Sequence, residues 1–155
     1  KLYREGRLTG VLGLGGSAGT TVGTAAMRAV PVGVPKVMVS TLASGDVRPY
    51  VGTRDVMMLH SVVDLCGLNR VSRAVLDNAA AAMAGMVREG ARGKGRGASE
   101  DKPLVTATMF GVTTPCVEAA RGHLDAAGYE VLVFHATGVG GRTIEGLIRD
   151  GALAG

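Results

Sequence analysis

Short apolar runs alternate along this sequence with glycine-rich turns and with stretches whose apolar residues recur at helical spacing. The pattern is clearest where the apolar run 8–12 is followed by a glycine-rich segment, 13–20, and then by Val22, Ala25 and Ala29. Such alternation is typical of parallel strands joined by helical crossovers. It predicts an α/β chain with a parallel-sheet, Rossmann-like, three-layer fold.

The same pattern predicts the other elements of the chain. Further strands are expected at 36–41, 55–59, 104–109 and 130–135, and further helices at 72–88, 114–127 and 143–150. Thr114 is expected to cap its helix, with Pro115 at the first helical position and Gly128 as the stop. Residues 42–54 are predicted to be a polar loop.

Composition agrees with a layered fold that packs through small side chains. Aromatic residues make up 3% of the chain and glycine alone numbers 25, so strands and helices can approach closely. The net charge is +4, but much of the excess lies in 88–96 and is not interleaved with aromatic rings. Nucleic acid is therefore not an expected partner.

Location is predicted to be cytoplasmic. No apolar run approaches the roughly 20 residues of a membrane span, and no signal peptide is visible. Cys66 and Cys116 stand alone in the sequence, which fits a reducing compartment and ordinary packing in the core.

Residues 91–102, within the glycine-rich, charged stretch 89–102, are predicted to be an exposed linker. Residues 1–90 are then part of a first α/β lobe, and 103–155 the start of a second. The chain begins in what reads as the end of a helix and stops just after another, so it is expected to be a piece of a longer protein.

The glycine-rich segment that follows the first strand is a predicted phosphate site. Glycines let the backbone approach an anion, and the free N–H groups at a helix start point toward it. Ser17, Thr20 and Thr21 offer hydroxyl donors. The alternative is a tight turn packed against neighbouring backbone, but four glycines within eight residues exceed what a turn needs.

The ligand at this segment is predicted to be a mononucleotide. Gly13, Gly15 and Ala18 fit the loose dinucleotide pattern, yet the next strand ends in Ser40 and Thr41 without the acidic residue that binds ribose in such sites. A P-loop is also excluded, because no Gly-Lys-Ser/Thr triplet is present.

A second glycine segment follows the strand 130–135. Gly138, Gly140 and Gly141 precede Arg142, whose guanidinium suits a phosphate or a carboxylate. The turn 111–114 is a candidate third wall of the site. The two glycine segments are expected to face each other across a cleft between the halves.

Other polar residues offer weaker alternatives. Asp46 is placed to assist a metal or a ribose, or simply to form a solvated turn. His60 and Asp64 follow the third strand without a third ligand, so no metal site is predicted. His135 is equally compatible with a structural and a functional role, and catalytic residues are not assigned.

Several runs resemble one protein family in order along the chain. They are GGSAGT at 15–20, PKVMVS at 35–40, ASGD at 43–46, SVVDLCGLN at 61–69, MFGVTTPC at 109–116 and VFHATGVGGR at 133–142. The family is that of the ATP-binding domains typified by the tomato mosaic virus resistance protein, with uncharacterised bacterial and fungal members.

The resemblance implies two Rossmann-like lobes and ATP as cofactor, with or without Mg²⁺. It also implies that the plant member binds viral replication proteins and thereby blocks replication of the viral RNA. A homo-oligomer is also expected. The alternatives for the function are a protein-interaction inhibitor of viral RNA replication proteins and a nucleotide-dependent enzyme acting on a small acid. On physical grounds the predicted nucleotide-binding residues are Gly15, Gly16, Ser17, Gly19, Thr20, Thr113, Thr114, Gly138, Gly140, Gly141 and Arg142.

Overall fold

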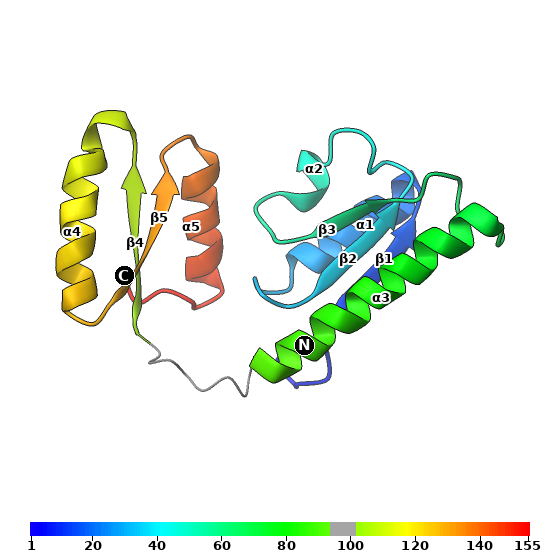
Figure 1. Ribbon diagram of the computed structural model, residues 1–155, viewed down its shortest axis with the longest axis horizontal. Helices are drawn as coiled ribbons and strands as arrows, with labels where there is room; N and C mark the ends of the chain where they lie inside the picture. The colour runs from blue at the N-terminus through cyan, green and yellow to red at the C-terminus, as the bar shows by residue number, and fades with distance from the viewer. Residues whose placement is uncertain (94–101) are drawn as a thin grey trace. The chain divides into compact units, whose positions relative to one another are not determined.

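The computed structural model describes residues 1–93 and 102–155, which belong to two compact units. Unit 1 comprises Lys1–Gly97 and unit 2 comprises Ala98–Gly155. Each unit holds a parallel sheet with helices on both faces, which confirms the α/β, Rossmann-like three-layer fold (Figure 1). Residues 94–101, which make up most of the predicted linker, lie outside the described residues.

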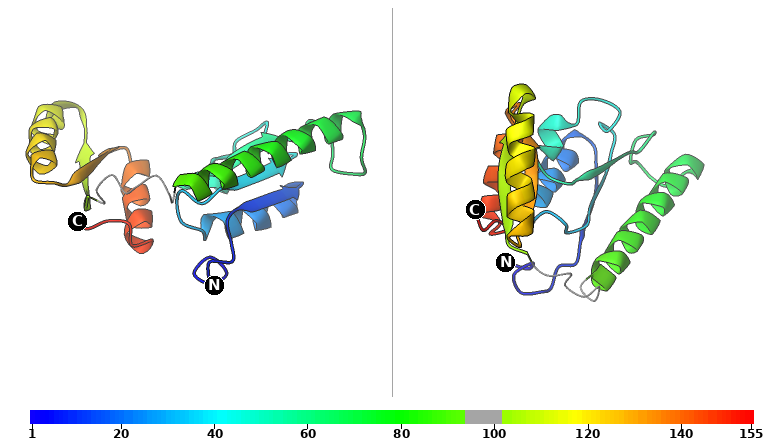
Figure 2. Two further views of the ribbon diagram at one scale, coloured as in Figure 1. Left: turned by 60° about the horizontal axis from the view of Figure 1, so that its bottom comes forward. Right: turned by 60° about the vertical axis from the view of Figure 1, so that its left-hand side comes forward.

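Unit 1 is built on three parallel strands in the order β1-β2-β3. The strands are β1 (Val11–Gly15), β2 (Lys36–Ser40) and β3 (Met57–His60). Helix α1 (Ser17–Arg28), with the short α2 (Arg48–Val51) beside it, covers one face of the sheet, and α3 (Arg70–Gly93) covers the other (Figure 2).

The side chains of β2 alternate between these two faces, as in any strand. Val37 and Val39 are fully buried against Ala79 of α3. Met38 points to the α1 face, where its sulfur lies 2.6 Å from the position that a Cβ at Gly13 would take. Glycine at that position of β1 therefore makes room for Met38, and β2 becomes the buried centre of the unit.

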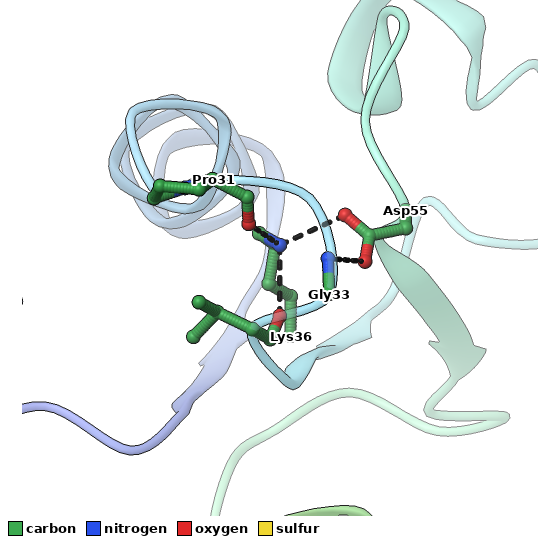
Figure 3. A network of polar contacts seen from close by, with 5 residues as sticks. Pro31, Gly33, Lys36 and Asp55 are labelled. Carbon is green, nitrogen blue, oxygen red and sulfur yellow. Dashed lines mark hydrogen bonds and ion pairs between the residues drawn. The ribbon is translucent and has the colours of Figure 1, made fainter. Parts of the chain in front are cut away.

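A fully buried lysine holds the amino end of this sheet together. The Nζ atom of Lys36 donates to the carbonyls of Pro31 and Val34, each at 2.7 Å, and to Oδ1 of Asp55 at 2.8 Å (Figure 3). The other carboxylate oxygen of Asp55 accepts from the backbone N–H of Gly33 at 2.8 Å. All three donors of the ammonium group are thus satisfied, as a buried charge requires.

Unit 2 is built on β4 (Leu104–Met109) and β5 (Glu130–His135), which pair in parallel. A 3₁₀ turn at Gly111–Thr113 leads into α4 (Thr114–Ala126), and α5 (Val139–Arg149) follows β5. The two helices lie on opposite faces of the sheet (Figure 2).

The last two residues lie along the free edge of β4. The N–H of Ala154 donates to the carbonyl of Leu104 at 2.8 Å, and the N–H of Thr106 donates to the carbonyl of Gly155 at 3.0 Å. Pro103, by contrast, accepts from Glu130 of β5. Because successive residues of a strand bond to opposite sides, β4 lies between β5 and this terminal segment.

Several element boundaries differ from the prediction in unit 1. Strand β1 starts three residues later than expected and continues to Gly15, because its register pairs Gly15 with Ser40 of β2. Strand β3 begins after Asp55, whose side chain is used by Lys36. The predicted loop 42–54 contains α2, and α3 extends to Gly93, so the first residues of the predicted linker are helical.

Unit 2 shows smaller differences. Thr113, not Thr114, occupies the N-cap of α4, and Gly128 lies just beyond its end with a φ of 89°. Helix α5 starts four residues earlier than predicted. The expectation that both cysteines pack in the core is wrong, because Cys66 and Cys116 are free and exposed.

No helix in residues 1–93 and 102–155 is both long enough and apolar enough to cross a membrane.

Replacing Lys36 by methionine is expected to lower the free energy of unfolding by about 2–4 kcal/mol, because buried carbonyls and Asp55 lose their donor. Urea denaturation of the full-length protein measures this change. Glu5→Ala, which removes an exposed ion pair with Arg7, is the control and is expected to have little effect. Equal losses in the two variants would contradict a special role for Lys36.

Candidate functional site

The predicted glycine-rich loop of unit 1 is a turn of one residue. Gly13 and Gly15 belong to β1, and α1 begins at Ser17, so that Gly16 alone connects the strand to the helix. The backbone of Gly16 is extended, with φ −79° and ψ −152°. The start of α1 therefore lies directly at the carboxyl end of β1.

The glycines at this turn differ in what surrounds them. A Cβ at Gly15 would lie 2.7 Å from the Cα of Gly19, so this pair allows the strand and the helix to touch. A Cβ at Gly16 would meet nothing closer than Oγ1 of Thr41, at 3.6 Å. Packing thus accounts for Gly15 but leaves Gly16 open to a ligand.

Thr20 has a structural role in the fold. Its side chain is fully buried, and its hydroxyl lies 2.6 Å from Oγ of Ser40 and 3.2 Å from the carbonyl of Gly15. The hydroxyl predicted to reach a phosphate is therefore used to tie α1 to the ends of β1 and β2. Thr21 bonds to the carbonyl of Ser17, and Ser17 itself is exposed at the helix start.

The amino end of α1 can receive an anion. No side chain caps the helix, and its first turn holds no acidic residue. The first N–H groups of a helix lack partners within it, and the helix dipole adds positive potential there. A phosphate at Gly16 and Ser17 would meet both effects.

Two neighbouring hollows open at the carboxyl ends of the strands of unit 1. The larger, about 410 Å³, is lined by Leu14, Gly15, Gly16, Asp64, Leu65, Gly67, Leu68 and Leu76. The smaller, about 230 Å³, is lined by Thr41, His60, Ser61, Val62, Val63 and Asp64. Asp64 borders both, and the larger hollow has the size of a small-molecule site.

Sequence reasoning missed the connection between Asp64 and the glycine turn. The dinucleotide pattern places the acidic residue after the second strand, where Ser40 and Thr41 stand, whereas Asp64 lies in the loop after β3. Parallel strands bring their carboxyl ends to one edge, so an acidic residue after any neighbouring strand is a candidate. This rule would have identified Asp64 as a candidate from the sequence alone.

Asp46 is engaged by a neighbouring arginine. Its two carboxylate oxygens accept from Nε and Nη2 of Arg48, at 2.9 and 2.8 Å, and Oδ1 also accepts from the Arg48 backbone N–H. These hydrogen bonds lower the pKa of Asp46 to about 2. This arrangement favours the solvated turn over a ribose or metal ligand.

His60 and His135 take part in local contacts. Nδ1 of His60 lies 3.4 Å from the carbonyl of Ser40, and the ring of His135 meets Phe110 edge-on, with ring centres 5.5 Å apart. Within 1–93 and 102–155, no place gathers three or more metal-ligating side chains.

In unit 2 the predicted residues gather at the carboxyl edge of β4 and β5. Thr113 exchanges hydrogen bonds with the backbone of Phe110, and Thr114 donates to the carbonyl of Gly111 at 2.8 Å. This turn and the start of α5 both follow the carboxyl ends of the two paired strands. Open α/β sheets bind ligands outside the carboxyl ends of their strands.

The second glycine segment is the beginning of α5 rather than a loop. Gly138 precedes the helix with a φ of 85°, and Gly140, Gly141 and Arg142 lie in its first turn. A Cβ at Gly140 would lie 2.4 Å from the carbonyl oxygen of His135, while one at Gly141 would meet nothing within 4 Å. Arg142 is exposed. The joint site of this segment with the turn of unit 1 stays a prediction.

Gly140→Ala is expected to destabilise unit 2 by about 1–3 kcal/mol, because the new methyl group collides with the backbone at His135. Gly141→Ala is the matched control and is expected to raise stability by up to about 1 kcal/mol through helix propensity. Thermal unfolding of both variants compares them directly. A Gly140→Ala protein as stable as Gly141→Ala would contradict the packing argument.

Asp46 is expected to titrate near pH 2 in the folded protein and at a higher pH in an Arg48→Ala variant, which removes the side-chain hydrogen bonds and keeps the one from the backbone N–H of residue 48. Because the folded pKa is depressed, the stabilisation by this pair is present above pH 3.8 and is lost as the pH falls toward 2. NMR titration of the Asp46 carboxyl carbon measures both values. An unchanged pKa of Asp46 in the variant would show that the Arg48 side chain does not lower it.

The chain matches the two domain models of one protein family. Residues 1–92 match the N-terminal domain of the uncharacterised protein family UPF0261, and residues 102–155 match its C-terminal domain. A UPF0261 protein of Clostridium tetani is 55% identical over 155 residues, which cover all of this chain and 37% of that relative.

Two tomato proteins are similar to the same extent. The ToMV resistance protein Tm-1(GCR237) of Solanum lycopersicum is 53% identical across 97% of this chain and 20% of its own length. The ToMV susceptible protein tm-1(GCR26) is also 53% identical, across 100% of this chain and 21% of its own length. The chain thus spans well under half of these relatives, and it belongs to the UPF0261 family.

Proposed function

We propose that this chain contributes a nucleotide-binding site in which the turn at Gly16 and Ser17 holds the phosphates of ATP. The observation that carries the proposal is the uncapped start of α1 beside a hollow of about 410 Å³. The nucleotide is held without a P-loop lysine, since Lys36 is fully buried and its three donors are used within the fold.

The accessible backbone at Gly16 supports this assignment. A phosphate oxygen can reach the N–H groups of the first turn of α1 because no side chain caps them, and a Cβ at Gly16 would meet nothing closer than Oγ1 of Thr41 at 3.6 Å. Ser17 is exposed and offers a hydroxyl, and Thr41 lies on the other side of the turn. These donors suit a phosphate group, which accepts several hydrogen bonds at once.

ATP binding is expected to weaken at least about tenfold in a Gly16→Val variant, because the larger side chain covers the phosphate position. Isothermal titration of the full-length protein with ATP, with and without Mg²⁺, measures the change. The absence of ATP and ADP binding by the unmodified protein would refute the proposal.

Gly45→Val is the matched control for this experiment. Gly45 lies in an exposed loop of the same unit, and its Cβ would likewise meet nothing closer than 3.6 Å. This variant is expected to bind ATP as the unmodified protein does. If ATP affinity fell equally in both variants, the cause would be a general effect of valine and not its position at the turn.

A second candidate function is binding of viral replication proteins, which the similarity to the tomato resistance protein favours. The tomato susceptible protein is equally similar, so overall identity does not separate the two properties. A binding assay between the full-length protein and tomato mosaic virus replication protein, with and without ATP, tests this candidate. Lack of binding in both conditions would reject it.

A further inference from the structure

The loop that follows β3 contains the one residue other than glycine with a positive φ among residues 1–93 and 102–155. Val62 has a φ of 66°, a conformation that is strained for a β-branched side chain. It is the centre of a three-residue turn closed by a 2.7 Å hydrogen bond from the N–H of Val63 to the carbonyl of Ser61. Strain of this kind persists only where the surroundings enforce it.

Buried Ser61 provides that enforcement. Its backbone N–H donates to the carbonyl of Ser40 at 3.1 Å, and its hydroxyl donates to the carbonyl of Val63 at 2.7 Å. The turn is therefore anchored to the end of β2 on one side and closed by its own serine on the other. Its effect is to direct the chain so that Asp64 borders both hollows.

The carboxylate of Asp64 is only partly used by the fold. Oδ1 accepts from the backbone N–H of Leu65 at 2.8 Å. Oδ2 has no hydrogen-bond partner among the residues that the structure describes. An acceptor thus remains available at the edge of the hollow that also contains Gly15 and Gly16.

The position of the Asp64 carboxylate beside the turn at Gly16 restricts the kind of ligand that fits the hollow. The carboxylate repels a bare phosphate, so the part of the ligand near Asp64 must donate hydrogen bonds. Much of the remaining lining is apolar and consists of leucines: Leu14, Leu65, Leu68 and Leu76. A ligand that carries phosphate, hydroxyl donors and a flat apolar group matches these three surfaces.

We propose that Asp64 accepts hydrogen bonds from the vicinal hydroxyls of a ribose, with the base against the leucines, so that the site selects ribonucleotides. This inference rests on the proposed function, since it concerns the same hollow. The anchored turn at Val62 holds the carboxylate in place before the ligand arrives, which reduces the ordering that binding requires.

The test compares ATP with 2′,3′-dideoxy-ATP by isothermal titration of the full-length protein. The unmodified protein is expected to bind ATP about tenfold more tightly, since charge-assisted hydrogen bonds to the hydroxyls are lost in the analogue. Asp64→Asn is expected to weaken ATP about tenfold and to leave the analogue unchanged. Asparagine keeps an acceptor for the Leu65 N–H, so the turn is retained, and the melting temperature checks this.

Asp77→Asn, on the exposed surface of α3, is the matched control and is expected to change neither affinity. Equal weakening of ATP and the analogue by Asp64→Asn would overturn the assignment. A loss seen only with Mg²⁺ present would place Asp64 on the metal and would also overturn it. If the unmodified protein bound neither nucleotide, the proposed function itself would fail, an outcome distinct from binding without discrimination.

Discussion

The close contact between β1 and α1 is the constraint on which the candidate site depends. Because Gly15 and Gly19 have no side chains, the first turn of the helix can lie against the end of the strand, and a single residue suffices to connect them. The hydroxyls of Thr20 and Ser40 then tie the helix to β2. The start of α1 is thereby fixed over the carboxyl edge of the sheet, where no side chain caps its first N–H groups.

The two ends of the unit 1 sheet differ in how far their polar groups are satisfied by the fold. At the amino end, a buried lysine is fully paired with two carbonyls and a carboxylate, and the network closes the structure. At the carboxyl end, the helix start, Thr41 and Asp64 surround open hollows. Satisfied polar groups stabilise one end, while groups with remaining hydrogen-bonding capacity occupy the other.

The sequence was sufficient to predict the order of strands and helices, because hydrophobic periodicity and glycine reflect local geometry. It misplaced β1 and α5 because glycine is compatible with strand, turn and helix start, and only the register with β2 or the packing on His135 decides between them. The pairing of Lys36 with Asp55 and the position of Asp64 depend on which strands are neighbours. Such contacts between distant residues leave no local pattern in the chain.

The glycines of the two motifs fall into two groups according to the space around them. Gly15 and Gly140 lie where a methyl group would collide with backbone, so packing alone is sufficient to explain them. A Cβ at Gly16 would make only an ordinary contact, 3.6 Å from Oγ1 of Thr41, and one at Gly141 would meet nothing within 4 Å; neither residue has a positive φ. A glycine-rich motif therefore contains glycines that the packing requires and glycines that it does not, and only a substitution of the second kind can test a binding hypothesis without a collision in the fold.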